Sequence, residues 1–246
     1  MRLQDKIAIV TGAGSGFGAG IAQKFAAEGA QVIVADINEA AADQVAGAIG
    51  GRAVQCNVAD GASVAALAQI TVEAFGRIDI LVNNAGVTHL PALMEEVSEE
   101  DFDRVMAVNC KSVYLMAREI VPLMKRAKYG SIVNIASTAG VSPRPRLNWY
   151  NASKGWLITA TKAMAIELAP FGVRVNALNP VAGDTPLLKS FMGEDTPDMR
   201  AKFLSTIPIG RFSTPEDLGN AACFLASDEA SMITGVAMEV DGGRCI

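Results

Sequence analysis

Short apolar runs alternate with longer segments of helical character along the chain. The runs are rich in Val, Ile and Ala, and a continuous apolar run of four to eight residues is typical of a strand that is buried on both faces. Seven strands are therefore predicted. They span residues 6–12, 31–36, 52–58, 78–86, 131–137, 173–180 and 237–243.

The segments between these runs carry apolar residues at helical spacing. Helices are predicted at residues 16–28, 39–48, 63–75, 98–126, 150–168 and 214–226. Strands that alternate with helices form a parallel sheet with right-handed crossovers. We therefore expect an α/β fold in which residues 1–246 form a single Rossmann-type domain. Its doubly wound, seven-stranded parallel sheet carries helices on both faces.

Two of the predicted helices begin with a capping signal. Ser98 is followed three residues later by Asp101, and Thr214 is followed three residues later by Asp217. A hydroxyl and an acidic side chain at this spacing resemble a capping box. We therefore interpret the acidic cluster at residues 95–103 as a helix N-terminus rather than as a metal site.

The net charge and the cysteine and histidine counts indicate which partners and which cellular location are expected. The chain has 246 residues, 19% of them charged, and a net charge of −5, which disfavours nucleic acids and anionic membranes as partners. The four cysteines are scattered and His89 is the single histidine, so we expect no metal. No leader peptide and no apolar stretch that could span a bilayer are predicted. A reducing, cytoplasmic location is the default expectation.

A glycine-rich turn joins the first predicted strand to the first predicted helix, and it reads TGAGSGFG over residues 11–18. Glycines let the backbone approach a pyrophosphate, and a helix N-terminus offers oriented N–H groups. Asp36 ends the second strand, where a carboxylate can bind the adenosine ribose and would repel a 2′-phosphate. Residues 12–18 contain no Arg or Lys, and Ile37 rather than Arg follows Asp36. The sequence therefore favours NAD over NADP.

Tyr150 and Lys154 lie four residues apart at the start of a predicted helix, so both project from one face. A free tyrosine titrates near ~10, which is too high for a base at neutral pH. An ammonium one turn away favours the phenolate and is expected to lower the pKa of Tyr150. Tyr150 could then exchange a proton with a hydroxyl or carbonyl substrate. Ser137, at the end of the fifth strand, could donate a hydrogen bond to the same substrate oxygen.

Several motifs in a fixed order resemble the short-chain dehydrogenase/reductase family over essentially the whole chain. The motifs are Thr-Gly-x-x-x-Gly-x-Gly at Thr11, Gly12, Gly16 and Gly18, Asn-Asn-Ala-Gly at residues 83–86, Asn109, Ser137, and Tyr-x-x-x-Lys at Tyr150 and Lys154. The resemblance implies a hydride transfer between NAD and a secondary alcohol or ketone. It implies a catalytic set of Asn109, Ser137, Tyr150 and Lys154. In that set, Asn109 would hold a water that relays protons through Lys154.

The resemblance also implies a line of cofactor contacts. They are Gly12, Ser15, Gly16, Phe17, Gly18, Asp36, Ile37, Asn57, Val58, Asn84, Ala85, Gly86, Tyr150, Lys154, Pro180 and Thr185. Within this set, Lys154 would hydrogen-bond the nicotinamide ribose, and Thr185 would hold the carboxamide.

Two positions depart from the family pattern. Asn57 stands before Val58 where family members usually carry Asp, but an amide oxygen can still accept a hydrogen bond from adenine. Val181 follows Pro180 where the family usually carries Gly, and a β-branched residue disfavours a turn with positive φ. We expect adenine binding of altered strength and a different backbone beside the nicotinamide.

Residues 183–212 are the one long irregular segment, and we interpret them as a mobile substrate lid with short helices. Arg144 and Arg146, between Ser137 and Tyr150, either bind an anionic substrate group or lie in a solvated loop. The predicted substrate-pocket residues are His89, Val141, Trp149, Leu188, Phe191 and Met192.

The predicted pocket residues do not identify the substrate. A 3-oxoacyl-[acyl-carrier-protein] reductase often uses NADP and carries a basic residue directly before the glycine that precedes the sixth strand. This chain has Asp36, which disfavours NADP, and Phe171 before Gly172, so both positions disfavour that alternative. A sugar or polyol dehydrogenase, such as glucose 1-dehydrogenase, fits Asp36 equally well. A non-catalytic NAD-binding regulator would be expected to lose a member of the catalytic set, and none is lost.

The expected partner is a small alcohol or ketone. The resemblance also implies a homotetramer, and apolar helices within residues 106–124 and 156–168 could form its contacts.

Overall fold

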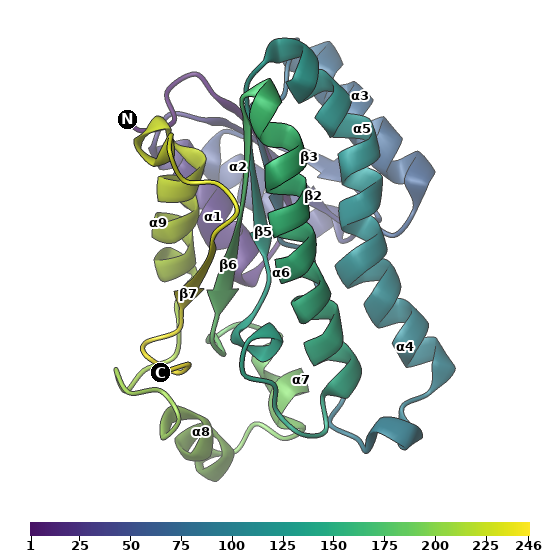
Figure 1. The fold of residues 1–246 in the computed structure, drawn as a ribbon, viewed down its shortest axis with the longest axis vertical. Helices are drawn as coiled ribbons and strands as arrows, with labels where there is room; N and C mark the ends of the chain where they lie inside the picture. Colours follow the sequence, from purple (N-terminus) through teal and green to yellow (C-terminus); the bar gives the residue numbers. More distant parts are fainter.

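The computed structural model describes residues 1–246 and contains one sheet of seven parallel strands (Figure 1). The strands are β1 (Ile7–Thr11), β2 (Gln31–Asp36), β3 (Arg52–Gln55), β4 (Ile80–Asn83), β5 (Gly130–Ile135), β6 (Val173–Pro180) and β7 (Ala237–Val240). Their order across the sheet is β3-β2-β1-β4-β5-β6-β7, so the direction of winding reverses between β1 and β4. The predicted doubly wound α/β fold is confirmed.

Two layers of helices cover the sheet. The helices are α1 (Gly16–Ala27), α2 (Glu39–Ile49), α3 (Gly61–Phe75), α4 (Glu99–Met106), α5 (Ser112–Ala127), α6 (Asn148–Leu168), α7 (Leu188–Met192), α8 (Pro197–Leu204) and α9 (Pro215–Ala226). Helices α1, α2 and α9 pack on one face, and α3, α5 and α6 pack on the other (Figure 1). In β1, Ala8 and Val10 contact the first layer, and Ile7 and Ile9 contact the second. Because both faces are buried, the strands form continuous apolar runs.

The two predicted capping signals differ in the structure. At α9, Thr214 Oγ1 accepts a hydrogen bond from Asp217 N, and the Asp217 carboxylate accepts one from Thr214 N, which completes the box. At α4, Ser98 Oγ accepts a hydrogen bond from Asp101 N at 3.1 Å. The Asp101 carboxylate instead accepts a hydrogen bond from Arg104 at 2.6 Å. Ser98 therefore caps its helix without the reciprocal half of the box.

The prediction of one continuous helix over residues 98–126 is wrong in one detail. A π-helix at Ala107–Lys111 interrupts it between α4 and α5. Such a turn inserts one extra residue into the helical repeat and is frequent at functional sites. Apolar positions continue on both sides of the insertion, so periodicity does not reveal it. The buried Asn109 lies within the π-turn.

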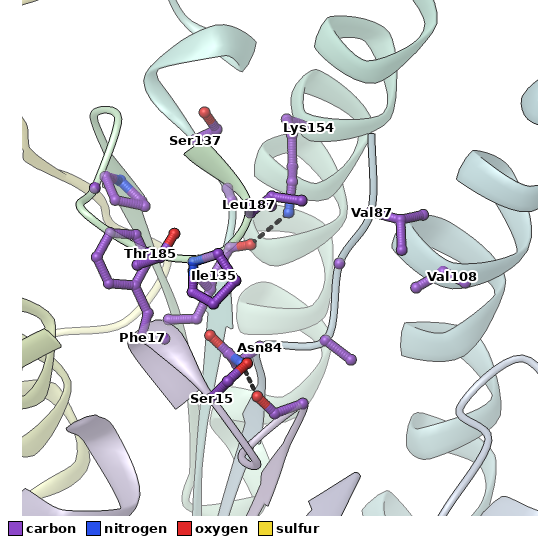
Figure 2. A pocket seen from close by; sticks show the side chains of 18 of the residues that line it. Ser15, Phe17, Asn84, Val87, Val108, Ile135, Ser137, Lys154, Thr185 and Leu187 are labelled. Carbon is purple, nitrogen blue, oxygen red and sulfur yellow. Dashed lines mark hydrogen bonds between the residues drawn. The ribbon is translucent and has the colours of Figure 1, made fainter. Parts of the chain in front are cut away.

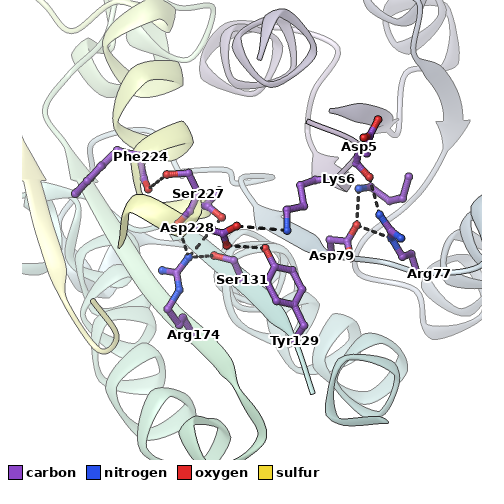
Figure 3. Close-up of polar contacts among 12 residues, drawn as sticks. Asp5, Lys6, Arg77, Asp79, Tyr129, Ser131, Arg174, Phe224, Ser227 and Asp228 are labelled. Atoms are coloured by element: carbon purple, nitrogen blue, oxygen red, sulfur yellow. Dashed lines mark hydrogen bonds and ion pairs between the residues drawn. The ribbon is translucent and has the colours of Figure 1, made fainter. Parts of the chain in front are cut away.

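Arg174, on β6, ties the sheet to the C-terminal end of α9 (Figure 3). Its guanidinium donates hydrogen bonds to the carbonyl oxygens of Leu225 at 2.8 Å and of Ser227 at 3.0 Å. These carbonyls lie at the C-terminus of α9, where a positive charge is favourable. Nearby, Lys6 lies 3.7 Å from the Asp228 carboxylate. The network holds the amino-terminal side of the sheet, away from the strand ends that face the cavity described below.

The segment predicted as a lid, residues 183–212, contains α7 and α8. Its apolar side chains form a small cluster of their own, in which Leu188, Met192 and Ile207 pack against Val181. The lid role itself stays a prediction. No helix of the structure combines the length and the apolar character that crossing a membrane requires.

Candidate active site

A cavity of about 460 Å³ opens at the carboxyl ends of the strands. Gly12, which follows β1, and Asn84, which follows β4, both line it, so it lies where the winding of the sheet reverses. Ligands of open parallel sheets bind at this kind of position. Figure 2 shows Ser15 and Phe17 from the glycine-rich turn, Lys154 from α6, and Thr185 and Leu187 from the lid segment around one space.

All of the predicted cofactor-binding residues except Gly18 line this cavity. Gly12 and Gly16 have φ of +60° and +54°, a region that favours glycine. A Cβ at Gly18 would lie 2.2 Å from the Gly12 carbonyl oxygen and 2.4 Å from Asn84 Nδ2. Gly18 therefore lets α1 approach the end of β1 instead of facing the cavity. The open backbone of this turn fits the diphosphate of a dinucleotide.

The Asp36 carboxylate is fixed at the end of β2. One oxygen accepts a hydrogen bond from Gly14 N at 2.9 Å, and the other accepts one from Asn38 N at 2.9 Å. Beside it, the Ile37 side chain is 65% exposed and lines the cavity. These contacts hold a negative charge at the rim while its remaining lone pairs stay available.

Asn84 ties the end of β4 to the glycine-rich turn. Its Nδ2 donates hydrogen bonds to the carbonyl oxygens of Thr11 at 2.8 Å and Gly12 at 3.0 Å. Thr11 Oγ1 in turn accepts hydrogen bonds from Asn84 N and Ala85 N. The Asn-Asn-Ala-Gly motif thus sets the shape of the cavity floor.

Tyr150, Lys154 and Ser137 meet on one side of the cavity, at 5%, 5% and 8% exposure. Lys154 Nζ lies 5.8 Å from the centroid of the Tyr150 ring, so the two side chains share a face of α6 as predicted. Lys154 Nζ donates a hydrogen bond to the Ile135 carbonyl oxygen at 2.8 Å, which is the dashed line near Lys154 in Figure 2. Ser137 Oγ accepts a hydrogen bond from Ala139 N.

The expected lowering of the Tyr150 pKa is wrong for this arrangement. Burial raises the pKa of Tyr150 to about 12, although hydrogen bonding with Ser137 and the charge of Arg144 oppose the shift. Burial also lowers the pKa of Lys154 to about 8. The low polarity of the site disfavours both the phenolate and the ammonium, and this effect outweighs their proximity.

Comparison with known proteins decides the family. A family model described as enoyl-(acyl carrier protein) reductase matches residues 12–244. The chain is 48% identical to a 4-formylbenzenesulfonate dehydrogenase of Comamonas testosteroni, over all of both chains. The chain belongs to the short-chain dehydrogenase/reductase family. As a member of that family, it is an oxidoreductase that transfers a hydride between a nicotinamide cofactor and an alcohol or carbonyl compound.

Two further relatives span different substrates. The chain is 41% identical to a D-threitol dehydrogenase of Mycolicibacterium smegmatis, over all of this chain and 95% of the relative. A crystal structure of a 3-ketoacyl-(acyl-carrier-protein) reductase from Brucella melitensis, complexed with NADH, is 50% identical. It superposes with a TM-score of 0.95 over 99% of this chain and 100% of that chain.

Asn109 differs from the other members of the catalytic set because its side chain does not line the cavity. Its amide donates hydrogen bonds to the Val87 carbonyl oxygen at 2.9 Å and to Ser153 Oγ at 3.0 Å, and its Oδ1 accepts one from Val87 N at 2.9 Å. These contacts fix the chain after β4 against α6. The side chain therefore has a positioning role in this structure, and the water relay at Asn109 stays a prediction.

Of the predicted substrate-pocket residues, only Phe191 lines the cavity. Its ring lies 5.1 Å from the Tyr150 ring, centroid to centroid, in an edge-on arrangement. Leu188 and Met192 lie on the same short helix but point into the apolar cluster of the lid segment. This is the expected result of helical spacing, which sends neighbouring side chains to different faces.

The other three predicted pocket residues lie outside the cavity for separate reasons. Val141 is 45% exposed at the surface. The Trp149 ring packs edge-on against Phe102, and its Nε1 donates a hydrogen bond to the Met94 carbonyl oxygen. His89 is buried, and its Nδ1 pairs with the Leu90 carbonyl oxygen at 2.8 Å.

The sequence favoured a solvated loop for Arg144 over the pocket, but the residue lines the cavity. Arg146 is exposed, with φ of +67°. Between Ser137 and Tyr150, Arg144 is the one residue that lines the cavity, and no spacing rule in the sequence predicts which of the two arginines does so. Val87 and Leu187 also line the cavity, and the only signal for them is that they directly follow Gly86 and Pro186.

The two departures from the family pattern are accommodated locally. Asn57 Oδ1 accepts a hydrogen bond from Ala59 N at 3.1 Å, and the residue lines the cavity. Val181 is buried and does not adopt a positive φ. A Cβ on Gly16 would lie 3.3 Å from the Thr185 Cβ, so the lid segment approaches the glycine-rich turn despite Val181.

Proposed function

We propose that this protein is an NAD-dependent oxidoreductase that interconverts a secondary alcohol and a ketone, with Tyr150 as general acid and base. The observation that carries the proposal is the meeting of Tyr150, Ser137 and Lys154 with the glycine-rich turn in one cavity. A scaffold that only binds a dinucleotide has no need of a buried phenol and hydroxyl beside the nicotinamide end.

The proton steps follow from these positions. In alcohol oxidation, the Tyr150 phenolate takes the proton of the substrate hydroxyl, and in ketone reduction the phenol returns it. The Ser137 hydroxyl donates a hydrogen bond to the same oxygen and stabilises its partial negative charge. A bound NAD would supply the hydride acceptor for the carbon that carries the hydroxyl. Lys154, whose Nζ donates a hydrogen bond to the Ile135 carbonyl oxygen, would hold the nicotinamide ribose.

The preference for NAD rests on Asp36. Its carboxylate lines the cavity at the end of β2, where hydrogen bonds from Gly14 N and Asn38 N fix its direction. A fixed negative charge accepts hydrogen bonds from a ribose diol and repels a 2′-phosphate. The neighbour with 50% identity is complexed with NADH, which supports the same choice.

The substrate has two main alternatives within this chemistry. The 50%-identical neighbour supports a 3-oxoacyl-[acyl-carrier-protein] reductase, and the D-threitol dehydrogenase supports a polyol dehydrogenase. The relative with 48% identity is named for an aromatic aldehyde. These relatives share the transfer of a hydride at a carbon that bears a hydroxyl or carbonyl oxygen, and for this chain we propose that the pair is a secondary alcohol and its ketone.

The test is an NADH absorbance assay with a panel of alcohols and ketones that includes polyols and a 3-oxoacyl thioester. We expect turnover with NAD and a kcat/KM at least about 10-fold lower with NADP, since repulsion at one fixed charge is worth on the order of 1.4 kcal/mol or more. Asp36→Asn removes the charge and should reduce this preference. Asp43→Asn, at an exposed carboxylate on α2, is the matched control and should leave it unchanged.

The assay also separates the proposal from its non-catalytic alternative. NAD binding without turnover of any alcohol or ketone would favour a regulator. An equal kcat/KM with NADP would contradict the assignment of Asp36.

A further inference from the structure

A cationic side chain lies in the cavity without a partner. Arg144 lines the cavity together with Tyr150, Ser137 and Phe191. Its backbone oxygen accepts a hydrogen bond from Asn151 Nδ2 at 2.7 Å, which fixes Arg144 next to the first turn of α6. The guanidinium itself has no hydrogen-bond or ion-pair partner within the chain. Its position is therefore set by its backbone and by packing, not by a carboxylate.

Phe203, on α8 of the lid segment, covers the guanidinium. The Arg144 Cζ lies 4.4 Å from the centroid of the Phe203 ring. Stacking uses the face of the guanidinium and leaves its edge, which carries the N–H donors, free for a planar or tetrahedral oxyanion. The lid segment thus supports a cation that faces the reaction end of the cavity.

Three of the other half-buried arginines have partners, and only Arg244 resembles Arg144 in having none; Arg2 pairs with Glu229. Arg174 donates to the carbonyl oxygens of the α9 C-terminus, and Arg200 forms ion pairs with Asp184 and Asp195. Arg144 has neither kind of contact. Burial lowers the pKa of Arg144, and the positive charge of nearby Arg244 lowers it further, so a second cation lies close by instead of a counter-ion. A partly buried cation of this kind is stabilised by an anion that enters the cavity.

We propose that Arg144 binds an anionic group of the substrate, so that the physiological alcohol or ketone carries a carboxylate or a sulfonate. The proposal rests on the proposed function, because it assigns the substrate end of the same cavity. Arg144 lies beside Tyr150, whereas the glycine-rich turn and Asp36 lie at the other side of the sheet's reversal point. Arg144 is therefore positioned to bind an anionic group of the substrate and not the diphosphate of the cofactor. Arg244 adds positive potential at the same place.

The test compares three ketones of similar shape: 4-acetylbenzoate, 4-acetylbenzenesulfonate and the uncharged 4-acetylbenzamide. We expect wild-type protein to reduce the two anions with a kcat/KM about 10- to 100-fold above that of the amide, the range of a charge-assisted hydrogen bond. In Arg144→Gln, the ratio of anion to amide should fall to about one. Arg144→Lys keeps the positive charge but loses the paired N–H donors of the guanidinium, so it should retain part of the preference for the anions over the amide.

Arg146→Gln is the matched control, because Arg146 is exposed on the same segment. It should keep the wild-type ratio. A wild-type ratio near one, or a ratio that survives in Arg144→Gln, would overturn the proposal. Reading the result as a ratio removes any general loss of activity or stability in the variants.

A direct binding measurement distinguishes failure of the Arg144 proposal from failure of the proposed function. If no ketone is turned over, the oxidoreductase proposal fails, and calorimetric titration of 4-acetylbenzoate still tests Arg144. Binding of the anion by wild type that is at least about 10-fold weaker in Arg144→Gln supports the site. Equal binding by the two proteins, or no binding by either, overturns it. Turnover of only the 3-oxoacyl carrier-protein thioester, with no anion preference, would also count against a small anionic substrate.

Discussion

At the scale of single residues, burial shifts the pKa values of the two groups that we propose to move or steer the proton. Tyr150 and Lys154 share one face of α6, yet the pKa of Tyr150 is raised to about 12 and that of Lys154 is lowered to about 8. Both shifts have desolvation as their largest cause. Tyr150 is therefore protonated at neutral pH, as its proposed role in reduction requires, and its basic form becomes available only as the pH rises.

This gives a signed pH prediction. Oxidation needs the deprotonated phenol, and below its pKa that fraction rises tenfold per pH unit, so kcat/KM for alcohol oxidation should rise with a slope near one from about pH 6 to pH 8. Above about 8, loss of the Lys154 charge should reduce the slope. Reduction uses the protonated phenol and should vary little over the same range. Steady-state kinetics in constant ionic strength measure both. Oxidation rates that are flat or fall between pH 6 and 8 would contradict it.

The sequence indicated the position of Tyr150 and Lys154 but not their pKa values. Spacing along a helix decides which side chains share a face, whereas desolvation depends on everything that packs around them. The same limit applies to Asn109, whose amide bonds Val87 and Ser153 through contacts that no local sequence pattern encodes. It also explains Arg144 and Arg146, which are chemically alike and two positions apart.

At the scale of elements, the glycines of the turn between β1 and α1 serve two purposes: they shape the backbone that lines the cavity, and they allow α1 to pack closely. Gly12 and Gly16 need a positive φ, and Gly18 needs the absence of a side chain. The glycine spacing located all three positions, but it did not show that Gly18 serves packing against Gly12 and Asn84 rather than cofactor contact. The π-turn at Ala107–Lys111 was not predictable in this way, since an inserted residue leaves the apolar pattern on both sides intact.

Gly18→Ala tests the close approach of α1. Its Cβ would meet the Gly12 carbonyl oxygen at 2.2 Å, so we expect a loss of about 1–3 kcal/mol in the free energy of unfolding. Gly47→Ala, in α2, is the control because its Cβ would have no neighbour within 4 Å. That change should instead stabilise the protein by about 0.5–1 kcal/mol through helix propensity. Urea unfolding measures both, and a Gly18→Ala variant as stable as wild type would refute the packing argument.

At the scale of the whole molecule, the order of the strands places the cavity. The reversal between β1 and β4 separates the loops that follow them, and the two helix layers form its sides. This topology was predictable from the alternation of strands and helices. The side-chain directions within the lid segment were less predictable. Leu188, Phe191 and Met192 are equally apolar, and only the packing of α7 decides which of them faces Tyr150.

The outer surface of α6 leads to a prediction about assembly. Trp156 is 41% exposed and Ile166 is 79% exposed on this helix, and Tyr114 on α5 is 54% exposed. We expect these side chains to be covered by further copies of the chain, so that sedimentation yields a tetramer. Ile166→Lys should reduce the assembled mass, since burial of one Ile is worth about 1.5–3 kcal/mol. Ala48→Lys, exposed on α2 in the opposite layer, should not. A wild-type monomer at micromolar concentration would count against this view.

The proposed role of Tyr150 is tested by the kcat of Tyr150→Phe on the best alcohol or ketone, measured together with the affinity for NAD. Phe keeps the ring that packs against Phe191 and removes only the hydroxyl. We predict a kcat that is lower by about 100- to 10,000-fold, with NAD binding that is nearly unchanged. A Tyr150→Phe variant that turns over at the wild-type rate would contradict the central claim that this phenol carries the proton.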